Sequence, residues 1–259
     1  MTELPFFQVD AFAEAPLTGN PAAVMPLDQW LPDGLMQAIA AENNLSETAF
    51  AVPSNNGERD YELRWFTPAT EVDLCGHATL AAAHVLITGE EIRFATRSGV
   101  LTVSREDDLL KLDLPAFEVE PGEAPGLLEA LGASGEIFLG EGGNNSAIVL
   151  LADEAAVRSV RPDFAALKTF DRLVIVTAPG DEQDIASRVF AVYHGIDEDP
   201  VTGSAHAALV PFWAKRLGRD RFTAFQASQR GGLLHCRLQD DRVVLGGRCV
   251  TVIEGRFRL

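Results

Sequence analysis

Three residues of this 259-residue chain can transfer a proton or bind an acid, and each stands at the boundary of a predicted element. Glu47 begins a predicted strand, and His77 begins a predicted helix over 77–88. Asp199 precedes a second predicted helix over 204–216. Moving a proton between two carbons requires a base that can later return the proton, and a carboxylate buried between apolar walls can do both in turn. The residue types therefore favour acid–base chemistry.

Each of the three residues also has a plainer interpretation. Glu47 is a solvated acid in one view, because most acids lie on the surface; strand alternation would instead place it on a face of small residues with room for a ligand. His77 is a helix cap in one view, although the N–H groups of a helix start behind Gly76 are a natural anion site. Asp199 is explained by the helix dipole as readily as Asp73 is before the first helix.

The elements that position these residues occur twice along the chain. Short landmarks of the first half return in the same order half a chain length later: Gly19-Asn20-Pro21 as Gly143-Asn144-Asn145, Pro32-Asp33 as Pro162-Asp163, Gly76-His77-Ala78 as Gly203-Ser204-Ala205, and Gly99-Val100-Leu101 as Gly232-Leu233-Leu234. Matches in one order are typical of a duplicated domain. Shared residues serve the shared scaffold, so polar residues that occur in one half only are the candidates for function.

We predict an α+β fold with two duplicated domains, each a strongly curved antiparallel sheet or barrel around a central helix. The first helix is small and apolar nearly all round, as a buried helix is. The domains are expected at 1–118 and 119–259, with the Pro- and Gly-rich stretch 115–126 as a linker. Both helix starts are expected to face one interdomain cleft.

Composition narrows the possible partners. A net charge of −17 argues against nucleic acid and against an anionic membrane, whereas a small carboxylate can still bind at a helix start. Cys75, Cys236 and Cys249 are widely spaced and form neither a disulfide framework nor a zinc motif. No apolar run approaches the roughly 20 residues of a membrane span. We expect a cytoplasmic protein without a metal, and a homodimer as the default assembly.

Longer motifs run from residue 9 to about 210 and match one protein family. They are Val9-Asp10-Ala11-Phe12 with Gly19-Asn20-Pro21-Ala22-Ala23-Val24; Asn44-Leu45-Ser46-Glu47-Thr48-Ala49-Phe50; Arg64-Trp65-Phe66-Thr67-Pro68 with Glu71-Val72-Asp73-Leu74-Cys75-Gly76-His77-Ala78-Thr79; and Asp197-Glu198-Asp199-Pro200-Val201-Thr202-Gly203-Ser204-Ala205-His206. The chain resembles the phenazine-biosynthesis (PhzF-like) isomerase family, which shares the diaminopimelate epimerase fold.

The resemblance implies an isomerase with two epimerase-like domains, a cleft between them, and neither a metal nor an organic cofactor. It implies that Glu47 is the acid/base and that the site is lined by further residues: His77, Asp199 and Ser204. The backbone N–H groups of Gly76 and Gly203 would bind the substrate, and Asn20 is taken as a further substrate-binding residue.

The favoured mechanism is an allylic or keto–enol proton shift on a small carboxylate, with both helix starts stabilising the enolate-like charge. A two-thiol epimerase is disfavoured, because that mechanism needs a second cysteine at the start of the second helix, and Pro200 falls near that position. Two alternatives stay open. One is an epimerase or racemase that uses Cys75 with Glu47, and the other is a non-catalytic binder of small carboxylates.

Overall fold

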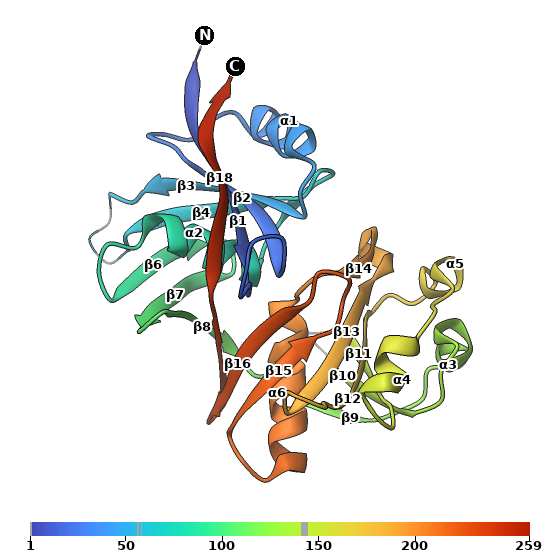
Figure 1. Cartoon of the computed structure of the whole chain (residues 1–259). Coiled ribbons are helices and arrows are strands. Elements are labelled where there is room, and N and C mark those ends of the chain that lie inside the picture. The colour runs from blue at the N-terminus through green and yellow to red at the C-terminus, as the bar shows by residue number, and fades with distance from the viewer. Residues whose placement is uncertain (1, 56, 58, 141–144) are drawn as a thin grey trace. The chain divides into compact units, whose positions relative to one another are not determined.

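The computed structural model describes residues 2–55, 57, 59–140 and 145–259, and the chain divides into two compact units (Figure 1). The first unit contains the residues up to Asp113 together with Gly246–Leu259, and the second contains Leu114–Leu245. The predicted landmark at 143–145 lies largely outside the described residues. No helix in the described part is long and apolar enough to cross a bilayer.

In its described residues the first unit contains two helices, the strands β1 to β8 and the last strand of the chain. Its elements are β1 (Glu3–Ala11), β2 (Asn20–Pro26), α1 (Asp33–Asn43), β3 (Glu47–Pro53), β4 (Tyr61–Phe66), β5 (Glu71–Val72), α2 (Gly76–Leu86), β6 (Glu91–Thr96), β7 (Gly99–Glu106), β8 (Leu109–Pro115) and β18 (Cys249–Arg258). The predicted central helix over 77–88 is α2.

The second unit follows the same order, with short helices added. Its elements are β9 (Val119–Pro121), α3 (Leu127–Leu131), β10 (Glu136–Gly140), β11 (Ser146–Leu150), α4 (Glu154–Ser159), α5 (Phe164–Leu167), β12 (Leu173–Pro179), β13 (Ile185–Ala191), a 3-10 turn (Val192–His194), β14 (Ile196–Asp199), α6 (Gly203–Leu217), β15 (Arg221–Gln226), β16 (Gly232–Gln239) and β17 (Arg242–Gly247). The predicted helix over 204–216 is α6.

Strand pairing repeats between the units. In the first unit β1–β2, β3–β4, β4–β5 and β6–β7 are antiparallel, whereas β2–β3 and β4–β6 are parallel. The second unit repeats this pattern with β10 to β16. The α+β class is confirmed, and the mostly antiparallel pairing is mixed with parallel pairs, because crossovers such as α1 between β2 and β3 join parallel neighbours. The common pairing order supports the duplication.

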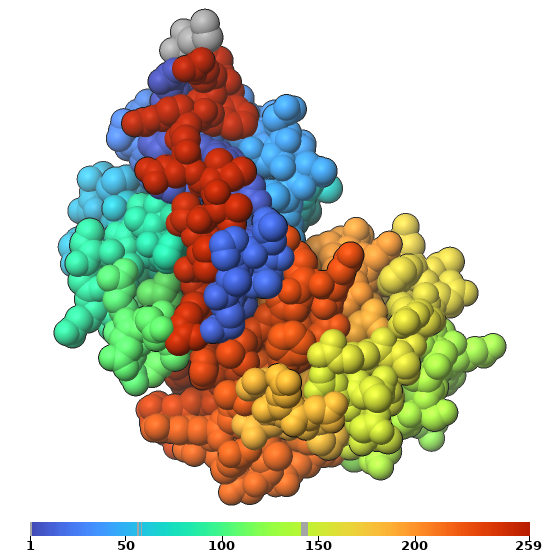
Figure 2. All heavy atoms as spheres, viewed as in Figure 1, coloured from blue at the N-terminus to red at the C-terminus, as the bar shows by residue number. Residues whose placement is uncertain are grey.

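The last strand departs from the predicted domain division. β18 pairs with β1 along its length, from Glu3 opposite Arg258 to Ala11 opposite Cys249. Figure 2 shows β18, in red, on the surface of the first unit beside the blue N-terminal residues. The observed units therefore differ from 1–118 and 119–259. The expected linker also contains β9, whose backbone pairs with β10.

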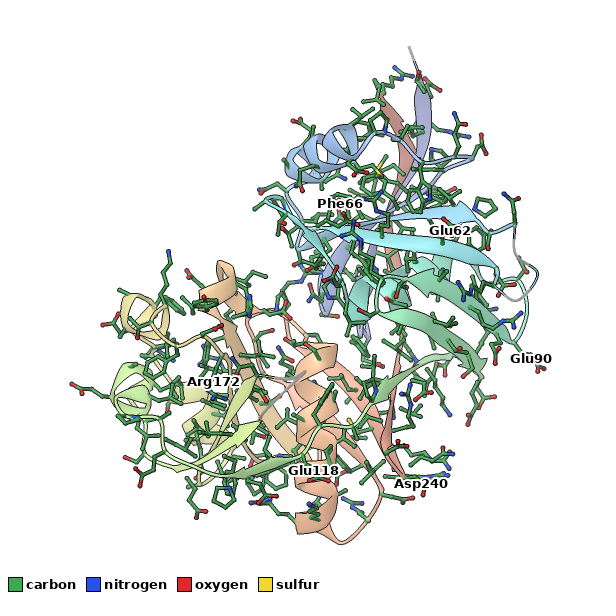
Figure 3. All side chains as sticks on the ribbon, turned by 180° about the vertical axis from the view of Figure 1, so that it is seen from behind. Glu62, Phe66, Glu90, Glu118, Arg172 and Asp240 are labelled. Atoms are coloured by element: carbon green, nitrogen blue, oxygen red, sulfur yellow. The ribbon has the colours of Figure 1, made fainter. Side chains whose placement is uncertain are left out.

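The first unit buries β3 on both faces. Phe50 and Val52 pack with Phe66 against α1, and Figure 3 labels Phe66 on the side of the sheet that α1 covers. Alternation turns Glu47, Ala49 and Ala51 to the other face, against which α2 packs. Glu47 therefore lies on the face of β3 that α2 covers. The small side chains along this face allow close packing of α2, whose own buried residues are mostly alanine.

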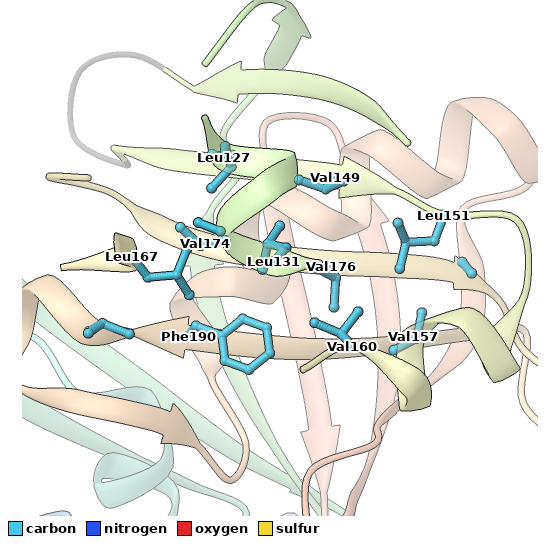
Figure 4. Packing of buried hydrophobic residues seen from close by; sticks show 14 residues of the cluster. Leu127, Leu131, Val149, Leu151, Val157, Val160, Leu167, Val174, Val176 and Phe190 are labelled. Atoms are coloured by element: carbon cyan, nitrogen blue, oxygen red, sulfur yellow. The ribbon is translucent and has the colours of Figure 1, made fainter. Parts of the chain in front are cut away.

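In the second unit, the short helices α3, α4 and α5 cover one face of the sheet. Figure 4 shows Leu127 and Leu131 of α3 and Val157 of α4 in one hydrophobic cluster with Val174 and Val176 of β12. The helix α6 contains Pro211, which has no backbone N–H to donate to the carbonyl one turn earlier. That carbonyl, of Ala207, instead accepts from the N–H of Phe117.

Gly19 is required by its backbone. Its φ is +66°, and a Cβ there would lie 2.3 Å from the carbonyl oxygen of Ala11. Gly19→Ala is expected to lower the free energy of unfolding by more than the about 1–2 kcal/mol of left-handed backbone alone. The matched control is Gly34→Ala in α1, where an added Cβ meets nothing within 4 Å and a gain of up to about 1 kcal/mol is expected. Urea unfolding measures both, and equal stabilities of the two variants would contradict the prediction.

Candidate active site

Glu47 and His77 meet where β3 and α2 begin. The Glu47 Oε2 atom lies 3.0 Å from Nε2 of His77, and the side chains are 11% and 6% exposed, respectively. Among the described residues neither atom makes a conventional hydrogen bond. Glu47 is therefore a buried acid in contact with His77 and not a solvated one.

The other ring nitrogen of His77 faces different groups. Nδ1 lies 3.2 Å from Nδ2 of Asn20 and 3.6 Å from Sγ of Cys75. The Ser46 hydroxyl donates to Oδ1 of Asn20 at 3.1 Å, so the amide nitrogen of Asn20 is the atom turned to His77. A neutral ring that accepts at Nδ1 carries its proton on Nε2. The network thus directs the imidazole proton of the neutral ring toward Glu47.

The charges of this cluster follow from its burial. Burial lowers the pKa of His77, but the neighbouring Cys75 and Glu47 raise it by more, to well above 6.5. Burial, reinforced by the charge of Glu47, raises the pKa of the Cys75 thiol to about 11. The thiol is therefore neutral near pH 7, and Glu47 is the charge that favours the protonated imidazole. The cluster is a carboxylate–imidazole pair with a neutral thiol behind it.

The same three side chains offer the ligand types of a zinc site. One ligand atom each of Glu47, Cys75 and His77 lies within 4.8 Å of the others. However, the imidazole stands between its partners, since Nε2 faces Glu47 and Nδ1 faces Cys75. One ring nitrogen binds one metal ion, so the three groups do not converge on a common point. The arrangement fits a row of polar contacts on either side of the imidazole better than a metal centre.

The start of α2 has no conventional side-chain cap. Cys75 is the N-cap residue, and its side chain makes no capping hydrogen bond. His77 is the second helical residue and its ring is engaged by its neighbours, so it does not cap the helix. The first N–H groups of a helix, here beginning with Gly76, have no partner within the helix, and together with the helix dipole they attract negative charge.

A second polar group lies in the other unit, where β14 leads to α6. Asp199 is the last residue of β14, and its Oδ2 accepts a hydrogen bond from the Thr202 hydroxyl. Both residues are buried. Thr202 is the N-cap of α6 without a side-chain capping bond, so Gly203 begins this helix as Gly76 begins α2. Ser204 follows in the first turn and is exposed.

Strand register separates Asp199 from Asp73. Asp199 pairs with Val189 of β13, and the residue in the same place in the first unit is Val72, which pairs with Trp65 of β4. Asp73 lies one residue later, is 74% exposed and faces Arg97 at 3.6 Å. A buried acid before the helix is therefore specific to the second unit.

Register also corrects the expected counterpart of Cys75. Cys75 and Thr202 are the N-cap residues of α2 and α6, so Thr202, and not Pro200, takes the place of a second thiol. Cys75 directly precedes Gly76 and Thr202 directly precedes Gly203, so the counterpart of Cys75 lies two residues after Pro200. Since a hydroxyl replaces the thiol, the objection to a two-thiol epimerase stands.

An arginine–glutamate pair lies before each of the helices α2 and α6, and neither pair was predicted from the sequence. Arg64 makes a bidentate pair with Glu71 at 2.7 and 2.8 Å, and Arg188 makes one with Glu198 at 2.7 and 2.9 Å. The Arg64 hydrogen bonds hold the pKa of Glu71 below its usual range. Each guanidinium also stacks on the phenylalanine two residues later. The recurrence of Arg-x-Phe in Arg64-Trp65-Phe66 and Arg188-Val189-Phe190 was the available signal.

Comparisons with known proteins agree with this architecture. The family model described as phenazine biosynthesis-like protein matches residues 9–255. A Pseudomonas aeruginosa protein named an uncharacterized isomerase is 53% identical over 264 residues, covering 99% of each chain. A PhzF-family crystal structure from Enterococcus faecalis superposes with a TM-score of 0.94 at 45% identity, covering 100% of each chain. A predicted epimerase from P. aeruginosa shares the fold, with a TM-score of 0.77 at 22% identity, covering 98% of this chain and 99% of that one.

Fold and relatives together define an isomerase with an epimerase-like fold. The chain belongs to the phenazine biosynthesis-like (PhzC-PhzF) family. The expectation that both helix starts face one cleft stays a prediction.

Proposed function

We propose that this isomerase moves a proton within a small carboxylate-bearing substrate, in an allylic or keto–enol shift without a cofactor, and that Glu47 is the acid/base. The observation that carries the proposal is the buried Glu47–His77 contact at 3.0 Å beside an uncapped helix start. A carboxylate in such a place can take a proton from carbon and return it to another carbon on the same face.

The surrounding groups would bind and orient the substrate. The N–H groups at the start of α2, from Gly76 onward, would hold the substrate carboxylate and stabilise the enolate-like charge as it develops. His77 would orient Glu47 or relay a proton. Asp199 is proposed as a catalytic residue that orients the substrate or relays a proton, and Gly203 and Ser204 as substrate-binding groups of the second unit. Because Asn20 contacts His77, its contribution would include fixing that ring.

Incubation with candidate unsaturated or β,γ-enolisable acids in D₂O tests the proposal. NMR spectroscopy should detect conversion and mass spectrometry should detect deuterium uptake, and the rate of either should depend on Glu47. Conversion with the original proton retained also supports the proposal, because one base can return the proton it removed. Acids that bind the protein, yet show neither conversion nor exchange, would contradict it.

A second candidate function is an epimerase that uses Cys75 with Glu47, favoured by the 3.6 Å contact between the Cys75 sulfur and His77. Against it, the thiol pKa of about 11 makes Cys75 a poor base near pH 7. Cys75→Ser is therefore expected to keep at least about a tenth of wild-type kcat/KM, whereas replacing a working thiol base or nucleophile normally costs far more.

Steady-state kinetics on Cys75→Ser, with thermal unfolding to verify the fold, measures this difference. Cys75→Ala is the companion variant, because it also removes any hydrogen bond to the His77 ring. A folded Cys75→Ser protein as inactive as Glu47→Gln would contradict the single-carboxylate mechanism and favour the two-base epimerase.

A further inference from the structure

Gln226, the last residue of β15, is fully buried and bonds both ends of the segment that carries Asp199 to α6. Its Nε2 donates to the backbone carbonyl of Asp199 at 2.7 Å and to the hydroxyl of Thr202 at 3.2 Å. Its Oε1 accepts from the backbone N–H of Thr202 at 2.9 Å. One amide therefore fixes three polar atoms of the segment.

These bonds give the hydrogen-bond chain a direction. An amide nitrogen only donates, so the Thr202 oxygen must accept from Gln226. A hydroxyl has a single proton, and that of Thr202 goes to Oδ2 of Asp199. The chain runs from Gln226 through Thr202 to the Asp199 carboxylate, and neighbouring bonds in such a chain strengthen one another.

The described residues of the first unit contain no equivalent of the hydrogen bonds made by Gln226. The register that places Gly99 opposite Thr96 places Gly232 opposite Gln226, so Thr96 is the counterpart of Gln226. In the described part of the chain the Thr96 hydroxyl bonds only within its own turn, to Gly99 and Ser98.

A neighbouring contact is common to both units. Ser98 donates to the carbonyl of Asp73, and Ser228 donates to the carbonyl of Pro200, each at 2.8 Å. The serine contact thus belongs to the shared scaffold. The glutamine occurs in the unit that has the buried acid before its helix.

We infer that Gln226 is a positioning residue for the isomerase: it holds Thr202 so that its hydroxyl fixes the Asp199 carboxylate at the start of α6. The inference rests on the proposed function, in which Asp199 acts on the substrate. Burial makes the arrangement stringent, because a buried donor or acceptor left without its partner is strongly unfavourable. The amide therefore has one arrangement that satisfies all its neighbours.

Gln226→Glu tests the inference, because it keeps the shape and removes both N–H donors. At neutral pH a carboxylate would face the carbonyl of Asp199, and kcat is expected to fall by about 10- to 100-fold, the effect of a displaced catalytic group. At lower pH the protonated carboxyl can donate to that carbonyl again, so the ratio of variant to wild-type kcat should rise. Gln226→Met, of similar length, should lose kcat without this recovery.

Thr96→Val, at the equivalent position of the first unit, is the matched control and should keep wild-type kcat. Thr202→Val keeps the backbone bonds of Gln226 but removes the hydroxyl, so it should reproduce the loss of kcat, whereas Thr202→Ser should not. This pair remains informative even if the Gln226 variants do not fold. A folded Gln226→Met protein with wild-type kcat, or a fully active Thr202→Val, would overturn the inference.

Asp199→Asn separates this inference from the proposed function. If Asp199→Asn keeps wild-type turnover, the proposed role of Asp199 fails and Gln226 has nothing to position. If Asp199→Asn loses turnover while the Gln226 and Thr202→Val variants keep it, the positioning role alone is wrong. The expected result is a loss of kcat for variants at all three positions, Asp199, Thr202 and Gln226, with kcat recovering at lower pH only in Gln226→Glu.

Discussion

Glu47→Gln is expected to abolish turnover while leaving the fold intact. Glutamine keeps the shape of the side chain and can still contact His77, but its amide cannot accept a proton from carbon. General acid–base catalysis contributes about 10²–10⁴-fold, which sets the smallest loss expected in kcat. Because the side chain is buried beside α2 and the substitution is isosteric, thermal unfolding should change far less than the rate does.

Glu91→Gln is a matched control, because Glu91 also begins a strand, β6, but its side chain is 55% exposed. It should retain full activity. The comparison separates the chemistry of a buried carboxylate from the loss of one negative charge in an acidic protein. Near-normal turnover by a folded Glu47→Gln protein would show that Glu47 is a structural acid, and the proposed mechanism would be wrong.

Local patterns predicted the parts of the site that depend on one element. Alternation along β3 placed Glu47 opposite Phe50, and the small apolar run after Gly76 predicted the buried helix α2. Both follow from periodicity, which depends on neighbours in sequence. The contact between Glu47 and His77 could not be derived in this way, because it depends on how β3 and α2 pack.

Features that depend on register were beyond the sequence. Asp73 stands three residues before Gly76 and Asp199 stands four before Gly203, a difference whose meaning became clear only when the strand pairing placed Val72, and not Asp73, at the position that corresponds to Asp199. The pairing of β1 with β18 joins residues 255 positions apart, and no local signal encodes such a partner. The Gln226 bonds likewise reach 24 and 27 residues back along the chain.

His77→Gln is expected to lower kcat by about 100-fold or more, because it removes the group that orients Glu47 or relays its proton. Residues that act as a unit have non-additive effects. The double variant Glu47→Gln/His77→Gln should therefore be little slower than Glu47→Gln alone. If the losses of the two single variants instead multiply, His77 acts independently of Glu47.

The same variant should change how stability depends on pH. The folded-state pKa of His77 lies above the unfolded value of 6.5, so protonation favours the folded state. The resulting stabilisation is complete below pH 6.5 and is lost as the pH rises through the raised folded-state pKa. The wild-type advantage over His77→Gln in free energy of unfolding, measured by urea unfolding across this range, should therefore shrink with rising pH.

His84→Gln provides the control, because burial lowers the pKa of His84 and the opposite trend is expected. A wild-type advantage over His77→Gln that stays constant with pH would mean that the Glu47 charge does not hold the proton on His77.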